Sequence, residues 1–337
     1  MAETKLLKKD SWPGLFEKLK ASGRRILAPR GKPERILFEE VSSPDGMAPN
    51  YIQTALSAKS VVFPRCEELF QYRFENKDVK IEDRKLDLPN TVLFGLRPCD
   101  AASFSALNAV FSWDYQDALF KSRLENTAVI GMSCNQSDDY CFCTSVGGGP
   151  GDTKGSDILL TRLDSGDFLA EIMTGKGREI VSLAPELFAP AASVEKEKFL
   201  AKAPARFDLK ELRKKLPGLF DSKLWVEQSL RCLGCGACAF VCPTCVCFDI
   251  QDEADRGGGS RLRCWDSCGF SLFTLHTSGH NPRSVQSQRW RQRLLHKFSY
   301  FPDRLEVLGC VGCGRCARSC PADMNLLEHL QEIMEAK

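Results

Sequence analysis

The cysteines near the C-terminus form one spacing pattern that occurs twice. In each copy two residues separate the first three cysteines, three residues precede the fourth, and a proline follows it, so the pattern reads C-x2-C-x2-C-x3-C-P. This spacing is typical of chains that hold cubane [4Fe–4S] clusters through cysteine thiolates, because a short loop can direct three sulfurs at one cluster. The first copy consists of Cys232, Cys235, Cys238 and Cys242, and the second of Cys310, Cys313, Cys316 and Cys320.

In two-cluster ferredoxins the fourth cysteine of one run ligates the cluster of the other run. Glycines between the cysteines fit such loops, since a residue without Cβ lets the backbone approach the cluster; they are Gly234, Gly236, Gly312 and Gly314. We therefore expect cluster one to be bound by Cys232, Cys235, Cys238 and Cys320, and cluster two by Cys310, Cys313, Cys316 and Cys242.

Two other chemistries use similar cysteine pairs. Zinc ribbons contain C-x2-C pairs, but a structural zinc ion gives no reason for the third cysteine step, the three-residue gap or the proline. Cys238, Cys242 and Cys245 also fit the C-x3-C-x2-C spacing of radical-SAM sites. That match lies inside the first run and leaves too little chain after it for a barrel. The pattern therefore favours iron–sulfur clusters.

The composition restricts the class of protein further. The 337 residues are enough for two domains, and 46 basic against 44 acidic residues give a net charge of +2, which provides no general attraction to nucleic acid or anionic membranes. Seventeen cysteines are an odd number in a chain too long for a typical secreted disulfide scaffold, so we expect reduced thiols in a cytoplasmic protein. Neither a signal peptide nor an apolar run of transmembrane length is evident, so any membrane role requires a partner.

A second group of cysteines follows two apolar segments. Residues 91–96 and 127–132 read as buried strands, and the helical pattern between them, with Asp100 as its N-cap, completes a β-α-β unit. Its strands should be parallel and adjacent, so that their carboxyl ends meet at one sheet edge. We expect a third [4Fe–4S] cluster there, with zinc as the alternative, because four thiolates suit both metals. The four thiols are Cys99, Cys134, Cys141 and Cys143.

Other segments complete the predicted N-terminal domain. The glycine-rich residues 145–151 are not a dinucleotide fingerprint, since they neither follow a strand directly nor open a helix. Cys66 stands alone between two predicted strands and is expected to be a small core residue. We expect a helix from about Ser11 to Gly23, strands at 25–28, 36–41, 61–64 and 69–74, and a hairpin formed by 157–163 and 167–173.

The predicted fold class is α+β or α/β. An α/β domain over residues 1–220 contains the β-α-β unit, and a mainly helical, ferredoxin-type domain over residues 221–337 holds two clusters. Between the two cysteine runs, residues 284–298 read as a helix with an apolar face, and its basic residues are expected on a solvated face beside a cluster. The apolar residues are Trp290, Leu294, Leu295 and Phe298, and the basic ones are Arg289, Arg291, Arg293 and Lys297.

Four further cysteines lie in or near this interval: Cys245, Cys247, Cys264 and Cys268. Their C-x-C and C-x3-C spacings leave a further metal site open. Nothing in the flanking residues is diagnostic of one, so we favour buried thiols packed around the clusters.

With these residues in view, the chain resembles the beta subunits of cytoplasmic sulfhydrogenases and the dicluster electron-transfer subunit of anaerobic sulfite reductase. The resemblance spans residues 96–321, and the combination of its motifs is specific. The motifs are LRPCD at 96–100, CFCTS at 141–145, CPTCVCFD at 242–249, WDSC at 265–268, HNPR at 280–283, HKF at 296–298 and FP at 301–302.

This resemblance implies a non-catalytic subunit that relays electrons. One partner would be a flavin-containing, NAD(P)-linked subunit, and the other a catalytic subunit of the hydrogenase, sulfite reductase or heterodisulfide-reductase type. This chain itself is expected to bind neither flavin nor nicotinamide. No Ser-His-Asp arrangement, Walker loop or paired-carboxylate motif supports catalysis by the chain alone.

The alternative is a metal-stabilised scaffold or a nucleic-acid-binding module with structural clusters. The near-neutral charge and the absence of interleaved aromatic and basic residues disfavour that alternative.

Overall fold

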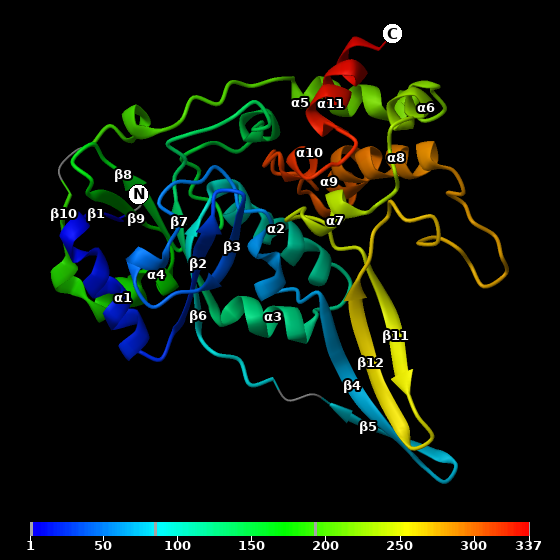
Figure 1. Ribbon diagram of the computed structural model, residues 1–337, viewed down its shortest axis with the longest axis horizontal. Helices are drawn as coiled ribbons and strands as arrows, with labels where there is room; N and C mark the ends of the chain where they lie inside the picture. Colours follow the sequence, from blue (N-terminus) through cyan, green and yellow to red (C-terminus); the bar gives the residue numbers. More distant parts are fainter. Residues whose placement is uncertain (1–2, 84–85, 192–193, 337) are drawn as a thin grey trace.

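The computed structural model describes residues 3–83, 86–191 and 194–336 (Figure 1). Its largest element is an eight-stranded sheet in which β2, β6, β7 and β8 run parallel, and the remaining pairs are antiparallel. The strand order is β10 (Phe188–Pro190), β1 (Glu3–Leu7), β9 (Phe168–Ile172), β8 (Ile158–Arg162), β7 (Thr127–Met132), β6 (Thr91–Leu96), β2 (Arg25–Lys32) and β3 (Arg35–Glu40).

Helices cover both faces of this sheet (Figure 1). Along β6, Val92 and Phe94 point towards α1 and α4, whereas Leu93 and Leu96 point towards α2 and α3. This arrangement explains why the strand is apolar at nearly every position. The covering helices are α1 (Trp12–Ala21), α2 (Pro98–Phe111), α3 (Ala118–Glu125) and α4 (Gly175–Leu183).

The predicted β-α-β unit is confirmed. β6 and β7 are adjacent and parallel, with Leu93 opposite Val129, and α2 and α3 lie between them in the chain. Asp100 is not the N-cap of α2, because the helix already begins at Pro98 and Arg97 occupies the cap position. A proline fits the first turn of a helix, where its missing N–H has no partner to lose. Asp100 therefore lies within the helix and its carboxylate is available elsewhere.

The helix and the hairpin predicted in the N-terminal part are confirmed, whereas one predicted strand is wrong. The helix expected from Ser11 is α1, and the hairpin expected at 157–173 is β8 and β9. The strand expected at 61–64 is wrong, since η3 (Ala58–Val61), a short 3-10 helix, occupies this part of the chain. The other 3-10 helices are η1 (Lys9–Ser11), η2 (Pro44–Gly46), η4 (Cys143–Val146), η5 (Pro185–Leu187), η6 (Lys196–Phe199) and η7 (Leu216–Leu219).

A separate four-stranded antiparallel sheet projects from the body as an arm (Figure 1). Its order is β11 (Phe248–Ala254), β12 (Gly258–Trp265), β4 (Cys66–Glu75) and β5 (Asp78–Asp83), so the two halves of the chain pair here. At its base the buried Glu67 binds Arg123 and Arg263. A disulfide joins Cys66 to Cys264 on the neighbouring strand, so Cys66 is not a lone core residue and Cys264 does not pack on the clusters as a free thiol.

The C-terminal part combines helices with the β11–β12 hairpin. Its apolar core contains Leu212, Trp225, Leu294 and Leu330, so α5 packs with helices that follow residue 220. The domain boundary at residue 220 stays a prediction. The helices are α5 (Leu209–Lys215), α6 (Leu224–Ser229), α7 (Ala237–Phe240), α8 (Gln286–Leu295), η8 (His296–Tyr300), α9 (Phe301–Leu305), α10 (Arg315–Arg318) and α11 (Leu326–Glu335). In the described ranges, no helix is long and apolar enough to cross a membrane.

Candidate metal centres

The two cysteine runs adopt the same local backbone conformation. Gly236 and Gly314 both have positive φ angles, +75° and +72°, and each precedes a one-turn helix, α7 or α10. A Cβ on Gly236 would lie 2.4 Å from the Phe270 ring, and one on Gly314 would lie 2.5 Å from the carbonyl oxygen of Tyr140. Glycine is therefore required at both positions for conformation and for space.

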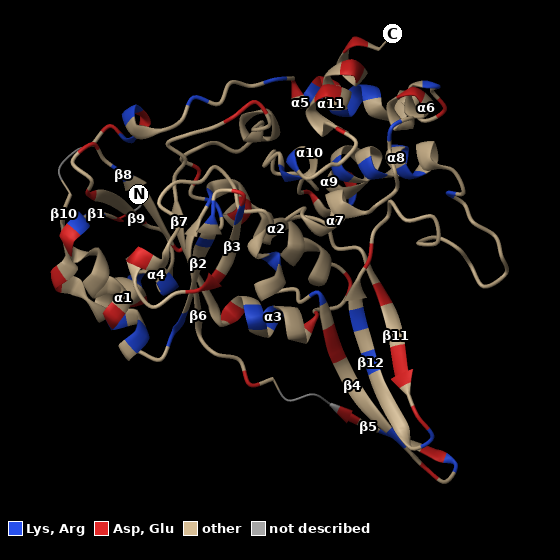
Figure 2. Ribbon diagram, viewed as in Figure 1, with Lys and Arg blue, Asp and Glu red and all other residues tan. Residues whose placement is uncertain are grey.

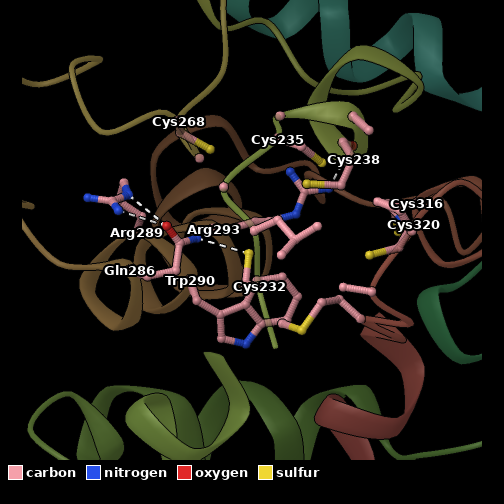
Figure 3. Close-up of a pocket in the computed structure, with 18 of the residues that line it drawn as sticks. Cys232, Cys235, Cys238, Cys268, Gln286, Arg289, Trp290, Arg293, Cys316 and Cys320 are labelled. Atoms are coloured by element: carbon pink, nitrogen blue, oxygen red, sulfur yellow. Dashed lines mark hydrogen bonds between the residues drawn. The ribbon is translucent and has the colours of Figure 1, made fainter. Parts of the chain in front are cut away.

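The thiols expected at cluster one border one cavity (Figure 3). Cys232, Cys235 and Cys238 line it from the first run, and Cys320 reaches it from the second. Cys316 and Cys268 also line this cavity. The fourth cysteine of the second run thus lies with the first three cysteines of the other run, as crossed ligation would require.

The thiols expected at cluster two form a more deeply buried group. Cys242 lies close enough to Cys310, Cys313 and Cys316 for its charge to raise their pKa values. Burial is the larger cause: it raises the pKa of Cys310 to about 11 and that of Cys313 to about 12. The pKa of Cys242 is instead well below its usual value, because Cys245 donates a hydrogen bond to it and Lys297 lies beside it. Metal binding at Cys310 and Cys313 must therefore displace tightly held protons.

Polar side chains donate hydrogen bonds to several of these sulfurs. Gln286 Nε2 lies 3.0 Å from Cys232 Sγ, and the Gln286 carbonyl oxygen in turn accepts hydrogen bonds from Arg289 (Figure 3). Lys297 Nζ lies 3.3 Å from Cys242 Sγ. Such outer contacts orient thiolate ligands and stabilise their negative charge. The donor set therefore fits iron–sulfur clusters at both cysteine groups.

The structure also places the sheet-edge thiols near one another. Cys99 lies in the first turn of α2 and Cys134 follows β7, and the charge of Cys134 contributes to the raised pKa of Cys99, for which burial is the main cause. Burial raises the pKa of Cys134 to about 11 and that of Cys143 to about 12, with added effects of neighbouring thiols, including Cys141. In the described parts of the chain, no three His, Cys, Asp or Glu side chains have the spacing to hold a single metal ion.

Cys99 connects the sheet edge to the second cysteine run. Its thiol interacts electrostatically with Cys134 and with Cys313, and it lines a cavity together with Cys143 and Cys310. The backbones of the sheet-edge loop and the second cysteine run are in direct contact: the amide N–H of Phe142 donates a hydrogen bond to the Gly312 carbonyl at 2.9 Å. The predicted third site therefore borders the predicted second one.

Two ion pairs join the sheet edge to the second cysteine run. Asp100 and Arg315, each about 2% exposed, form a bidentate pair in which Arg315 also donates to the Thr54 carbonyl at 2.8 Å. Asp138 pairs with Arg318, whose guanidinium lies 3.4 Å from Cys141 Sγ. Sequence reasoning missed both pairs, because 215 and 180 positions separate their partners.

The predicted solvated face of α8 is wrong. Arg289, Arg293 and Lys297 are buried among the cysteine runs, and Arg291 is half-buried. The predicted apolar residues do lie in the core, including Trp290 and Leu294. The three buried basic residues repeat every four positions and so form one stripe along the helix. That spacing was the available indication that they act as a group.

The remaining free cysteines lie close to the second site. Cys245 is buried and hydrogen-bonded to the Cys242 thiol, as expected for a thiol packed around a cluster. Cys247 and Cys268 are half-buried and share a hydrogen bond. All three line one small cavity together with Lys297.

Comparisons with known proteins agree with this geometry. Residues 231–324 match the 4Fe-4S dicluster domain family, and this range contains both cysteine runs. The chain is also 32% identical to Sulfhydrogenase 2 subunit beta of Pyrococcus furiosus in an alignment that covers 98% of each chain. Identity at this level along the full length establishes common descent. The chain therefore belongs to the family of sulfhydrogenase beta subunits and is an iron–sulfur, electron-transfer member of that family.

Proposed function

We propose that this chain relays single electrons through three [4Fe–4S] clusters arranged in series. Cluster one is bound by the thiols around the first cavity, cluster two by the buried group around Cys242, and the third by the sheet-edge thiols. The observation that carries this proposal is the continuity of the thiols: Cys316 borders cluster one, and Cys99 borders both Cys313 and Cys134. A cysteine assigned to one site thus lies beside the next site in each case. Electron transfer from site to site requires such close neighbours.

The bound clusters supply reversible one-electron chemistry, and the chain supplies their environment. Buried thiols exclude water from cluster two, whereas Cys235 is exposed at cluster one. Leu230 and Leu233, at 79% and 71% exposed, precede that exposed ligand in the chain, and Leu233 lines the same cavity. We infer that a partner exchanges electrons with the chain at this apolar surface, since large exposed leucines beside a functional group are typical of interaction sites.

The proposal also includes two partner subunits and a ferredoxin-type domain in this chain. The relative from Pyrococcus furiosus is named as a beta subunit, so that protein is one chain of a sulfhydrogenase. For the present chain we propose a flavin-containing, NAD(P)-linked partner and a catalytic oxidoreductase partner. The segment from residue 221 is proposed to act as a mainly helical, ferredoxin-type domain, with the β11–β12 hairpin as an addition that pairs with the arm.

Metal analysis of the intact chain tests the number of clusters. Three cubanes correspond to about twelve iron atoms per chain, and the variant Cys143→Ala should lose about four of them. Cys264→Ala is the matched control, because this cysteine lies in the arm and is bonded to Cys66. About eight iron atoms together with one zinc in the intact chain would show that the sheet edge binds zinc instead. A control variant that loses as much iron would show that the assignment of Cys143 is wrong.

Reversible reduction separates the electron-transfer function from a structural role. The intact chain should accept electrons from dithionite and return them to a dye, with EPR signals that appear and vanish accordingly. The chain alone should not turn over hydrogen, sulfite or a disulfide. Clusters that cannot be reduced reversibly would instead support the scaffold alternative.

A further inference from the structure

Buried cations in this protein fall into two groups. Within the described ranges, eight Lys and Arg side chains are buried, and three of them, Arg123, Arg263 and Arg315, pair with a carboxylate. The other five have no carboxylate within 4.0 Å in the part of the chain that the structure describes, and all of them border free thiols. These five are Lys59, Arg97, Arg289, Arg293 and Lys297.

Three of the five converge on the short segment that contains Cys242 and Cys245. Lys297 Nζ lies 3.3 Å from Cys242 Sγ and 2.6 Å from the Gly309 carbonyl. Arg293 donates to the Cys238 carbonyl at 2.8 Å and lies 3.7 Å from Cys245 Sγ. The three side chains are only 3–5% exposed, so water cannot solvate them freely.

The third cation comes from the opposite end of the chain. Lys59, in η3, donates to the carbonyl oxygens of Cys245 at 2.9 Å and of Ala239 at 3.3 Å. Its ammonium also lies 4.0 Å from the centre of the Trp265 ring. A residue more than 180 positions away thus places its charge beside the same thiols.

Burial of an unpaired cation is strongly unfavourable, and buried charges in proteins are normally paired or bound to metal sites. Carbonyl and hydroxyl oxygens satisfy the donors of Lys297 but cannot balance its charge. The anions close to these cations are the thiolates that would hold cluster two. A cubane with four thiolate ligands carries a net negative charge, and this charge increases by one when the cluster accepts an electron.

We propose that Lys297, together with Lys59, is the counter-charge of cluster two and makes it the more easily reduced cluster of the ferredoxin-type pair. Arg293 lies between the two sites, because it also lines the cavity of cluster one and donates to the Cys238 carbonyl. This inference rests on the proposed function, because it requires a cluster at Cys242. Reduction adds one electron from an external reductant and breaks no bond, so the added charge stays on the cluster. A nearby ammonium in a low-dielectric interior stabilises that charge.

Figure 2 shows the contrast in charge. The segments α8 and α10 carry basic residues and no acidic ones, whereas acidic residues are frequent on β4 and β11. Arg315 of α10 is neutralised by Asp100, but Lys297 has no such partner among the described residues. Arg315 should therefore affect the nearby clusters less than Lys297 does.

An EPR-monitored redox titration of the intact chain tests this role. Lys297→Met keeps the length of the side chain and removes its charge, whereas Lys297→Arg keeps the charge. At the wild-type midpoint of cluster two, we expect Lys297→Met to lower the ratio of reduced to oxidised cluster about tenfold, which is about 59 mV for a one-electron couple. Lys297→Arg should stay closer to the wild type.

Lys176→Met is the matched control. The Lys176 ammonium also donates to two carbonyl oxygens, those of Leu124 and Thr127, at 2.9 and 2.7 Å. Thr127 begins β7, at the end of the strand opposite to Cys134. This variant should leave every cluster midpoint unchanged.

Iron analysis distinguishes a failure of the proposed function from a failure of the counter-charge role. Wild-type chain with fewer than about eight iron atoms would refute the proposed function itself. Lys297→Met with full iron and an unchanged midpoint would overturn the counter-charge role, as would an equal shift in Lys176→Met. If Lys297→Met loses iron, Lys59→Met replaces it, because the Lys59 ammonium donates to carbonyl oxygens and lies over a ring, and it makes no hydrogen bond to a thiol within the described residues. A lowered midpoint of cluster two in Lys59→Met supports the counter-charge role, and an unchanged midpoint refutes it.

Discussion

The contact between the sheet edge and the second cysteine run, and the surroundings of Cys242, both contain thiols and buried cations, but they balance charge differently. At the sheet edge Asp100 neutralises Arg315 and Asp138 neutralises Arg318, so two of the cations carry their own counter-ions. Around Cys242, the cations Lys297 and Arg293 have no carboxylate partner within the described ranges. The two ion pairs of the first region need no cofactor to balance their charge, whereas the cations around Cys242 would be balanced by an anionic cluster.

Removal of a ligand should have the largest effect. Cys242→Ala should lose the iron of cluster two, about four atoms per chain, because three thiolates from the second run leave one corner unligated. Cys247→Ala should retain all the iron, since its thiol contacts Cys268 and is interpreted as a packed thiol. Iron and sulfide analysis distinguishes the two variants. Iron loss in Cys247→Ala would revive the further metal site that its C-x-C spacing leaves open.

Loss of a carboxylate at the sheet edge should have the next largest effect. Asp100→Asn leaves the buried Arg315 without a counter-ion and should lower the free energy of unfolding by about 3–5 kcal/mol. The double variant Asp100→Asn with Arg315→Met should recover much of that loss, because no uncompensated charge remains. Urea denaturation of the iron-free chain measures both values. Equal stability of the single variant and the wild type would contradict the charge balance described for this region.

Features that depend on residues close together in the sequence were predictable, and features that depend on residues far apart in the sequence were not. The spacing around Cys232 and Cys310 and the apolar strand at 91–96 are local patterns, so they predicted the cysteine groups and the β-α-β unit. The partners of Asp100 and Lys59 come from segments 215 and more than 180 positions away, and no local pattern reveals them.

The prediction that the basic residues of α8 face solvent failed for a different reason. Charged residues on an amphipathic helix normally face water. This expectation did not consider that thiolate ligands can balance the positive charge of buried basic residues. Similarly, Cys66 and Cys264 pair because β4 and β12 are neighbours, an arrangement that joins the two halves of the chain and has no local sequence pattern.

The iron-free chain should lose stability in alkali. Burial raises the pKa of Cys143 from 9.0 to about 12, so the folded chain holds this proton more tightly than the unfolded chain does. Its contribution to stability is fully present below pH 9 and disappears as the pH rises towards 12. Urea denaturation of the reduced, iron-free chain across this range checks the direction. Cys143→Ala should weaken the pH dependence, and an unchanged dependence would contradict the assigned burial effect.

The smallest effect is expected for a neutral hydrogen-bond donor. Gln286→Leu removes the hydrogen bond to Cys232 Sγ and should lower the midpoint of cluster one by less than Lys297→Met lowers that of cluster two, because no full charge is lost. Gln292→Leu, on the same helix, is the control. The same redox titration gives both values. A larger shift in Gln286→Leu than in Lys297→Met would reverse the predicted ranking of hydrogen bonding and charge.

An anaerobic redox titration of the intact chain, followed by EPR and paired with iron analysis, tests the central claim most directly. The account predicts about twelve iron atoms per chain in clusters that accept and release single electrons reversibly, with cluster two reduced before cluster one. Fewer iron atoms, or clusters that stay oxidised under dithionite, would contradict the electron relay. Full reversible reduction with cluster one reduced first would contradict the counter-charge role of Lys297 alone.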